Sequence, residues 1–420
     1  MVGLSRRLAS PVGITGAAAV MVLTSCTQTT AVRQDAAGQR VQQAVAQVAP
    51  KITITPADGS SGVALDAPVV VSASAGALGS VRLIEGGSAT PLRGELSSDG
   101  TSWRSTEGLD SRANYTVTAT ATAGPNLQAS AHSSFSTLRA QSRLLTSTSP
   151  DDGSVVGVGE PISLRFSDSI PPSRRASLLS RIAISTSTPV LGAWHWFTSN
   201  TVHFRTRDYW QPGTQVTVTA NLKGFDVGDG TWGLGSWTSS FTVGDKHLSM
   251  IDDATHTMNV YDNDQLIDTW PVSMGKAGFT TIQGTLIVLY KTYDVKMNSC
   301  TTFGGAACIP GTANFYNEDV YYDTAISSDG YFIHSAPWSV YAQGHYDVSH
   351  GCVNLSPSRA TTFFNWSRPG DVVVINHTGN PAGEQDGEGD WQIDFSQFDN
   401  AGFGTVNTGQ SDNTIANRAT

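Results

Sequence analysis

YTVTATA at residues 115–121 and VTVTANL at residues 216–222 are two stretches, rich in β-branched residues, in which apolar residues alternate with polar ones. Successive side chains of a strand point to opposite faces, so this period of two is typical of a half-buried β-strand. Each stretch is flanked by other short alternating segments and by turn-forming residues. The pattern predicts small antiparallel β-sandwiches around both stretches.

The two stretches belong to a repeat of roughly one hundred residues. Residues 52–74 read ITITPADGSSGVALDAPVVVSAS, and residues 147–168 read STSPDDGSVVGVGEPISLRFSD. Each has a Pro-x-Asp-Gly turn and, about a dozen residues later, a proline that leads into an alternating strand. We therefore expect two immunoglobulin-like β-sandwich modules, one at 51–140 and the other at 141–245.

The sequence changes character from Lys246 onward, and we interpret residues 246–378 as a third, β-rich domain. GTLIVLY, GYFIHSA and GDVVVIN predict strands there. SPSRATTFFNWSRPG predicts one short helix, with Ser356 as N-cap and Pro357 in the first turn. The fold class is thus mainly β: two sandwich modules and a β-rich third domain with a short helix.

Beyond this domain, residues 379–400 include GDWQIDFSQF, whose three aromatic residues predict a segment that packs back on a neighbouring part of the chain. The last twenty residues, 401–420, have few large apolar side chains. We expect them to be a disordered tail.

The N-terminus has the features of an export signal. Arg6 and Arg7 precede a short apolar run, and Leu23-Thr24-Ser25-Cys26 follows it. This ending resembles a bacterial lipobox, which implies that residues 1–26 hold a lipoprotein signal, that the chain is cleaved before Cys26, and that Cys26 is lipidated. An ordinary cleaved signal is the alternative. Residues 27–50 are polar and rich in Ala and Gln, as in a flexible tether. We expect an exported protein, lipid-anchored to the outer face of the cytoplasmic membrane and facing the wall.

Charge excludes some partners. The formal net charge is -10, which argues against nucleic acid or an anionic membrane surface as the main partner. Only 14% of the residues are charged, so a highly charged disordered chain is also excluded.

Cysteine number points to a free thiol. If Cys26 carries a lipid, Cys300, Cys308 and Cys352 remain, and an odd number leaves one unpaired. Cys300 and Cys308 bound a Gly-rich loop that is long enough for a disulfide between them. Cys352 is then the free thiol, although pairing of Cys352 with either of the others stays open.

Cys352 follows a glycine turn, and His334 ends the predicted strand YFIH, so the two could form a nucleophile and its general base. His350 is an equally valid base on residue type alone. A zinc site made from His334, His345, His350 and Cys352 is a further alternative, although the usual paired ligand spacing is missing. No carboxylate is adjacent in sequence, so a backbone carbonyl is the expected partner of the imidazole.

Residues 334–357, HSAPWSVYAQGHYDVSHGCVNLSP, resemble the signature of the YkuD-type L,D-transpeptidases. The signature is a histidine, a spacer and Ser/Thr-His-Gly-Cys, followed by a hydrophobic residue and Asn or Arg. The resemblance covers about 247–398, and the preceding lipobox and sandwich modules are similar to the actinobacterial branch of the family.

The resemblance implies roles for individual residues. Cys352 is the nucleophile, His334 is its general base, and the Ser335 carbonyl fixes the imidazole tautomer. The N–H groups of Gly351 and Cys352 form the oxyanion hole. The other implied members of the pocket, which orient or contact substrate, are His350, Ser349, Asn354, Met297, Tyr316, Tyr322 and Trp338, with residues 298–315 as a lid.

The implied reaction is acyl transfer without a cofactor. Cys352 attacks a peptidoglycan tetrapeptide stem, releases D-Ala, and passes the acyl group to a second stem to give a 3-3 cross-link. Peptidoglycan stems as donor and acceptor, a membrane lipid anchor and carbapenem inhibitors are the implied partners. An L,D-carboxypeptidase or other cysteine hydrolase, with water as acceptor, is the first alternative. A non-catalytic wall-binding lipoprotein is the second.

Overall fold

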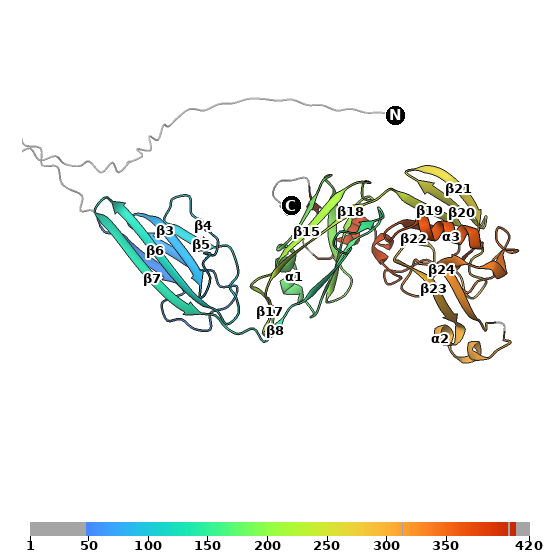
Figure 1. The fold of residues 1–420 in the computed structure, drawn as a ribbon, viewed down its shortest axis with the longest axis horizontal. Coiled ribbons are helices and arrows are strands. Elements are labelled where there is room, and N and C mark those ends of the chain that lie inside the picture. Colours follow the sequence, from blue (N-terminus) through green and yellow to red (C-terminus); the bar gives the residue numbers. More distant parts are fainter. Residues whose placement is uncertain (1–47, 313, 402–403, 409–420) are drawn as a thin grey trace, which may run out of the picture. The chain divides into compact units, whose positions relative to one another are not determined.

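The computed structural model describes residues 48–312, 314–401 and 404–408, and its described parts are mainly β (Figure 1). The predicted fold class is confirmed. The expected signal peptide, Cys26 and nearly all of the expected tether lie outside the described residues. Within the described residues, no helix has the length and apolar character needed to cross a membrane.

The first sandwich has two antiparallel sheets, with strand orders β1-β2-β5-β4 and β3-β6-β7. The stretch 115–121 lies in β6 (Asn114–Gly124), where Tyr115, Val117 and every second residue after them are buried, as the alternation predicted. The other strands are β1 (Lys51–Thr55), β2 (Val70–Ser74), β3 (Ala77–Glu85), β4 (Gly94–Leu96), β5 (Ser102–Ser105) and β7 (Leu127–Ser136).

The second sandwich has a four-stranded sheet, β10-β18-β15-β12, and a five-stranded sheet, β28-β13-β14-β11-β9. Trp194 and Trp210 are fully buried in the core between these strands. The elements are β8 (Ser142–Arg143), β9 (Thr146–Ser149), β10 (Val155–Val156), β11 (Ile162–Phe166), α1 (Pro172–Leu179), β12 (Ile182–Thr186), β13 (Leu191–Trp196), β14 (Thr201–Thr206), β15 (Gln215–Asn221), β16 (Phe225–Gly228), β17 (Thr231–Gly233) and β18 (Ser236–Val243).

The third part of the chain is built from two sheets, β21-β20-β19-β27-β22 and β23-β24-β25-β26. The predicted helix is α3 (Pro357–Trp366), with Ser356 at its N-cap position, although the Ser356 hydroxyl accepts no capping hydrogen bond. The other elements are β19 (His247–Asp252), β20 (Thr257–Asp262), β21 (Gln265–Pro271), β22 (Gly284–Ile287), β23 (Tyr290–Asn298), α2 (Ser299–Phe303), η1 (Gly305–Cys308), β24 (Asn317–Ala325), β25 (Phe332–Ser335), η2 (Pro337–Ser339), β26 (Val353–Leu355) and β27 (Val372–Asn376).

The C-terminal segment packs on the second sandwich through η3 (Gly389–Gln392) and α4 (Phe395–Phe398). Ile393 and Phe398 form an apolar cluster with Ala193 of β13. The expectation of disorder from residue 401 onward needs correction, because β28 (Val406–Asn407) pairs antiparallel with the edge of β13. Val406 is buried there, so the open edge of the sheet and an apolar side chain together order these residues.

Candidate active site

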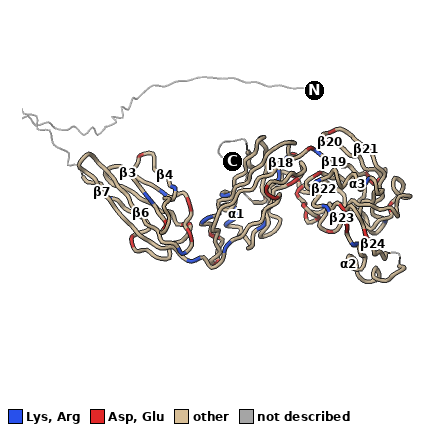
Figure 2. Tube along the Cα trace, in the orientation of Figure 1, with Lys and Arg blue, Asp and Glu red and all other residues tan. Residues whose placement is uncertain are grey.

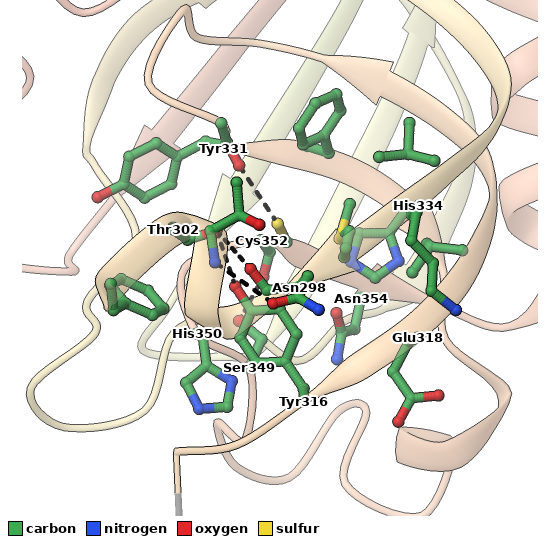
Figure 3. Close-up of a pocket in the computed structure, with 18 of the residues that line it drawn as sticks. Asn298, Thr302, Tyr316, Glu318, Tyr331, His334, Ser349, His350, Cys352 and Asn354 are labelled. Carbon is green, nitrogen blue, oxygen red and sulfur yellow. Dashed lines mark hydrogen bonds between the residues drawn. The ribbon is translucent and has the colours of Figure 1, made fainter. Parts of the chain in front are cut away.

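A cleft of about 630 Å³ opens where β25 and β26 lie side by side (Figure 3). The two strands run parallel, and their register places His334 opposite Asn354, with Cys352 directly before β26. Cys352, His334 and Asn354 all line the cleft. Parallel strands need a long connection, and the crossover here, residues 336–352, carries the rest of the motif.

His334 is fixed in one tautomer. Its Nδ1 lies 3.0 Å from the carbonyl oxygen of Ser335. A carbonyl can only accept a hydrogen bond, so Nδ1 carries the proton and the lone pair resides on Nε2. His334 is only 3% exposed, and this burial lowers the pKa of the imidazole to about 4, against the opposing effect of the Ser335 hydrogen bond. At neutral pH His334 is therefore a neutral base.

Cys352 carries the free thiol among the described cysteines. Its Sγ donates a 3.7 Å hydrogen bond to the carbonyl oxygen of Gly330 (Figure 3). Burial raises the pKa of the thiol to about 12, the charge of Asp323 adds to the increase, and a backbone hydrogen bond from Phe332 opposes it. The resting pair is thus a neutral thiol and a neutral imidazole, and not a preformed thiolate–imidazolium pair.

The turn before Cys352 is braced by Ser349. The Ser349 hydroxyl accepts a hydrogen bond from the Gly351 N–H at 3.0 Å and donates to the Cys352 carbonyl oxygen at 2.7 Å. Gly351 has a φ of 128°, and a Cβ at this position would lie 2.9 Å from the Tyr331 ring, so only glycine suits the turn. The expectation that the Gly351 N–H is an oxyanion donor needs correction, because Ser349 already occupies it. Of the two expected donors, this leaves the Cys352 N–H.

Thr281 braces the same turn from another part of the chain. Its buried hydroxyl donates a 2.7 Å hydrogen bond to the Gly351 carbonyl oxygen and accepts one of 2.9 Å from the Gly275 N–H. The sequence analysis did not identify this residue. No local pattern could have done so, because the two hydrogen-bonded residues are 70 positions apart.

His350 lines the cleft, but its surroundings are those of a packed aromatic residue. Its ring centroid lies 4.8 Å from that of Phe279 and 4.9 Å from that of Tyr316. Burial and, to a smaller extent, the charge of Lys276 together lower the pKa of His350 to about 4. The backbone hydrogen bond that fixes an imidazole tautomer is found at His334, so the geometry favours His334 over His350 as the base.

Asn354 has one satisfied and one unsatisfied polar group. Its Nδ2 donates a 3.0 Å hydrogen bond to Ser339 Oγ, which orients the amide. Its Oδ1 is buried and has no hydrogen-bond partner among the described residues. This oxygen is therefore an acceptor in the cleft wall whose hydrogen bond is not yet made.

The expected substrate-binding side chains separate into two groups. Met297, Tyr316 and Trp338 line the cleft, and the Trp338 ring lies 6.1 Å from that of His334. Tyr322 does not line it, so its assignment is wrong. A register shift between Tyr321 and Thr324 and a φ of 59° turn the Tyr322 side chain toward Tyr293 and Phe364 instead.

The predicted lid begins with α2 and η1, and a Cys300–Cys308 disulfide joins them. Asn298 caps α2 by accepting hydrogen bonds from the N–H groups of Cys300 and Thr301. Phe303 of α2 reaches the cleft and packs 5.2 Å from Phe279. The Cys300–Cys308 disulfide and the free thiol of Cys352 agree with the pairing expected from the odd number of cysteines. Cys26 lies outside the described residues.

Several lining residues were missed from the sequence. They include Lys296, Glu318 and Tyr331, whereas Asn298 and Phe303 also line the cleft but belong to the predicted lid. Tyr331 lies in the same strand-like segment as His334, so its proximity had a local signal. Lys296 and Glu318 had none, because the β23–β24 pairing that brings their strands together is not a local feature.

Two groups of possible metal ligands occur in the described parts of the chain, and neither contains Cys352 or His334. His345 does not line the cleft. The zinc alternative for this cleft is therefore not supported by its geometry.

Comparison with known proteins identifies the family. Residues 246–375 match the model of the L,D-transpeptidase catalytic domain, YkuD, and residues 60–226 match the model of a bacterial Ig domain. The chain is 39% identical to L,D-transpeptidase 2 of Mycobacterium tuberculosis over 350 residues, which are 83% of this chain and 84% of that protein. The chain belongs to the L,D-transpeptidase family.

Further similar proteins are also named as L,D-transpeptidases. L,D-transpeptidase 5 of M. tuberculosis is 27% identical, over 83% of this chain and 76% of that one. A solved LD transpeptidase in complex with imipenem is 32% identical, with a TM-score of 0.46, and the match covers 55% of this chain and 97% of that one. Members of the L,D-transpeptidase family are transferases, so the cleft is the candidate site of acyl transfer.

Proposed function

We propose that this chain forms 3-3 cross-links in peptidoglycan through a thioester on Cys352. The observation that supports this most directly is the arrangement of His334: its Nδ1–H is donated to the Ser335 carbonyl, and its Nε2 is left as a base in the cleft that Cys352 also lines. A thiol and a neutral imidazole with a fixed tautomer are the parts that nucleophilic acyl transfer requires.

The first half-reaction acylates the enzyme. Cys352 Sγ attacks the carbonyl carbon of the L-centre of meso-diaminopimelate in a tetrapeptide stem, and its proton passes to His334 Nε2. Collapse of the tetrahedral intermediate breaks the peptide bond to the terminal D-Ala. The departing amine takes the proton from His334, which leaves a thioester on Cys352 and free D-Ala.

The second half-reaction transfers the acyl group. The side-chain amine of another stem attacks the thioester carbonyl, His334 accepts the amine proton, and the proton returns to Cys352 Sγ as the new amide forms. Energy of the original peptide bond is held in the thioester, so no nucleotide is consumed. The neutral resting pair implies that proton transfer accompanies attack.

The experiment that tests this proposal is mass analysis of the products from purified protein and a disaccharide tetrapeptide. We expect a dimer with a 3-3 linkage and one equivalent of released D-Ala. Tripeptide monomers as the sole product would contradict the proposal and support the L,D-carboxypeptidase alternative. Absence of any product would contradict both.

Carbapenem acylation of Cys352 is part of the same proposal. A β-lactam carbonyl is an electrophile of the kind that the thiol would attack in the stem. Imipenem, which the solved relative holds, is a suitable first compound. Its test is intact-mass analysis of the chain before and after incubation, with Cys352→Ala as control. An adduct of equal yield in Cys352→Ala would contradict it.

We also propose that Cys26 is lipidated and anchors the protein to the outer face of the cytoplasmic membrane. The support is the sequence Leu23-Thr24-Ser25-Cys26 after a basic and apolar leader. Metabolic labelling with a fatty acid in the native host, compared with Cys26→Ala, tests this. Equal labelling of both proteins would contradict it.

A further inference from the structure

A buried cluster of charged side chains lies outside the active site, between β14 and the C-terminal segment. His203 of β14 has its Nδ1 at 3.0 Å from Asp390 Oδ2 and at 3.1 Å from Glu388 Oε2. Asp390 is fully buried, and His203 is 6% exposed. The donor atoms of His203, Glu388 and Asp390 all lie within 4.8 Å of one another. Figure 2 shows acidic stretches of the chain near β22, which contacts η3.

Hydrogen bonds do not satisfy this cluster. One N–H at His203 Nδ1 points in one direction, so it can serve Asp390 or Glu388 but not both. The hydrogen bond goes to Asp390 Oδ2, while Asp390 Oδ1 and Glu388 Oε2 are buried with no hydrogen-bond partner among the described residues. Open carboxylate oxygens with no access to water are costly unless a cation binds them.

The nearby positive charge of Arg205 is engaged by groups other than these carboxylates. The Arg205 guanidinium donates to the Ile393 carbonyl oxygen and packs against the rings of Trp391 and Phe398. A third acidic side chain, Glu160, is also buried, and the charges of Glu388 and Asp390 act on it. The site is therefore rich in carboxylate oxygen, with one imidazole nitrogen aimed into it.

We propose that His203, Glu388 and Asp390 bind a divalent metal ion of the zinc type, through His203 Nδ1 and one oxygen of each carboxylate. Metal–ligand distances of about 2.0–2.2 Å in a tetrahedron place neighbouring ligand atoms about 3.3–3.6 Å apart. The His203 Nδ1 separations of 3.0 Å from Asp390 and 3.1 Å from Glu388 are slightly shorter, so a small outward shift would admit the ion. The mixed nitrogen and oxygen set favours zinc over magnesium or calcium. A water would occupy the fourth position.

Such a metal would fasten the C-terminal segment. The residues that follow Asp390 already bridge two parts of the chain: Trp391 Nε1 donates to the Gly159 carbonyl oxygen, and Gln392 donates to the Thr285 carbonyl oxygen. A metal held by β14 and the start of η3 would add a further connection at the same place. This role is structural and independent of the proposed transpeptidation.

The test is metal binding by the full chain carrying Cys352→Ala, so that the active-site thiol cannot contribute. After treatment with a chelator, Zn²⁺ titration should give one site per chain, and bound Zn²⁺ should raise the melting temperature. His203→Gln and Asp390→Asn should each weaken binding by about 100-fold or more, because each removes a ligand. Asp394→Asn, an exposed carboxylate in the same segment, and His256→Gln, from the other ligand group, are matched controls that should bind as the parent does.

A second readout guards against misfolding of the variants. Co²⁺ added to the parent protein should give visible absorption bands of a tetrahedral nitrogen–oxygen site, without a sulfur charge-transfer band. Absence of Zn²⁺ binding, absence of these bands, or equal Zn²⁺ affinity in the parent and in correctly folded His203→Gln would overturn the proposal. The cluster would then be a buried ion-pair network.

Discussion

The Ser349 hydroxyl spans the turn that presents Cys352, because it donates to the Cys352 carbonyl oxygen at 2.7 Å while it accepts from the Gly351 N–H. Ser349→Ala removes both hydrogen bonds, and we expect it to lower the rate of acylation by about 10- to 100-fold through displacement of the nucleophile. Ser349→Thr keeps the hydroxyl and should retain most of the rate. Intact-mass kinetics with imipenem measure both. Equal loss in the two variants would show that the hydroxyl is not the relevant group.

Thr281 supports the same turn from outside the motif. Thr281→Val should leave the Gly351 carbonyl and the Gly275 N–H without their partner and lower the free energy of unfolding by about 1–3 kcal/mol. It should also slow acylation. Thr280→Val is the matched control, since the structure gives that hydroxyl no hydrogen bond within the described residues. Denaturant unfolding and acylation kinetics of the two variants make the comparison, and equal behaviour would contradict the role of Thr281.

The neutral resting state of Cys352 predicts unusual reactivity. Burial raises its pKa to about 12, above the 9.0 of an ordinary cysteine, so the thiolate is a much smaller fraction of the thiol at pH 7 than in an exposed cysteine. Iodoacetamide, which requires the thiolate, should therefore alkylate Cys352 slowly at pH 7 and faster as the pH rises above 9. A titration midpoint below pH 7 would instead reveal a thiolate–imidazolium pair.

The low pKa of His334 makes the free energy of unfolding decrease as the pH falls below about 6.5. His334 has a folded-state pKa of about 4, below its ordinary value of 6.5, so the unfolded chain binds more protons between these values. Its contribution to stability is present above about pH 6.5 and decreases as the pH falls toward 4. The midpoint of denaturant unfolding, measured from pH 7 to 4, should fall less in His334→Gln than in the unchanged protein. An equal fall in both would contradict the low pKa.

The disulfide between Cys300 and Cys308 closes the start of the lid beside Phe303. In Cys300→Ser/Cys308→Ser we expect a several-fold higher KM for stems with a nearly unchanged acylation limit, because the lid is less ordered while Cys352 and His334 are untouched. Steady-state kinetics of the double variant test this. A lower acylation limit at unchanged KM would contradict it, because the disulfide would then affect the chemical step and not substrate binding.

Thiol titration tests the disulfide itself. In Cys26→Ser protein, one thiol should titrate without reductant and three with it.

Local patterns predicted a large part of this fold. Alternation at 115–121 and 216–222 identified β6 and β15, because side-chain period is a property of the strand itself. The helix α1 was missed, since Pro171 stands at its N-cap position and no capping side chain marks its start. The strand β28 was missed because two residues acquire order only through the edge of β13.

The site was predictable where it lies within one motif and unpredictable where the chain folds back. His334, the Ser335 carbonyl and Cys352 fall within nineteen consecutive residues of the sequence. Tyr322 was placed wrongly, because a register shift in β24 reverses the face that alternation would assign. The Thr281 hydroxyl bonds to Gly351, 70 positions away, and His203 bonds to Asp390, 187 positions away. No local sequence pattern indicates contacts over such separations.

The central claim is that Cys352 accepts the acyl group with His334 as its base. The most direct measurement is the time course of intact mass when the chain meets a disaccharide tetrapeptide. The unchanged protein should gain the mass of the donor less D-Ala on the peptide that contains Cys352. His334→Gln should acylate about 100-fold or more slowly, because it lacks the base. An adduct in Cys352→Ala, or acylation of His334→Gln at the unchanged rate, would contradict the account.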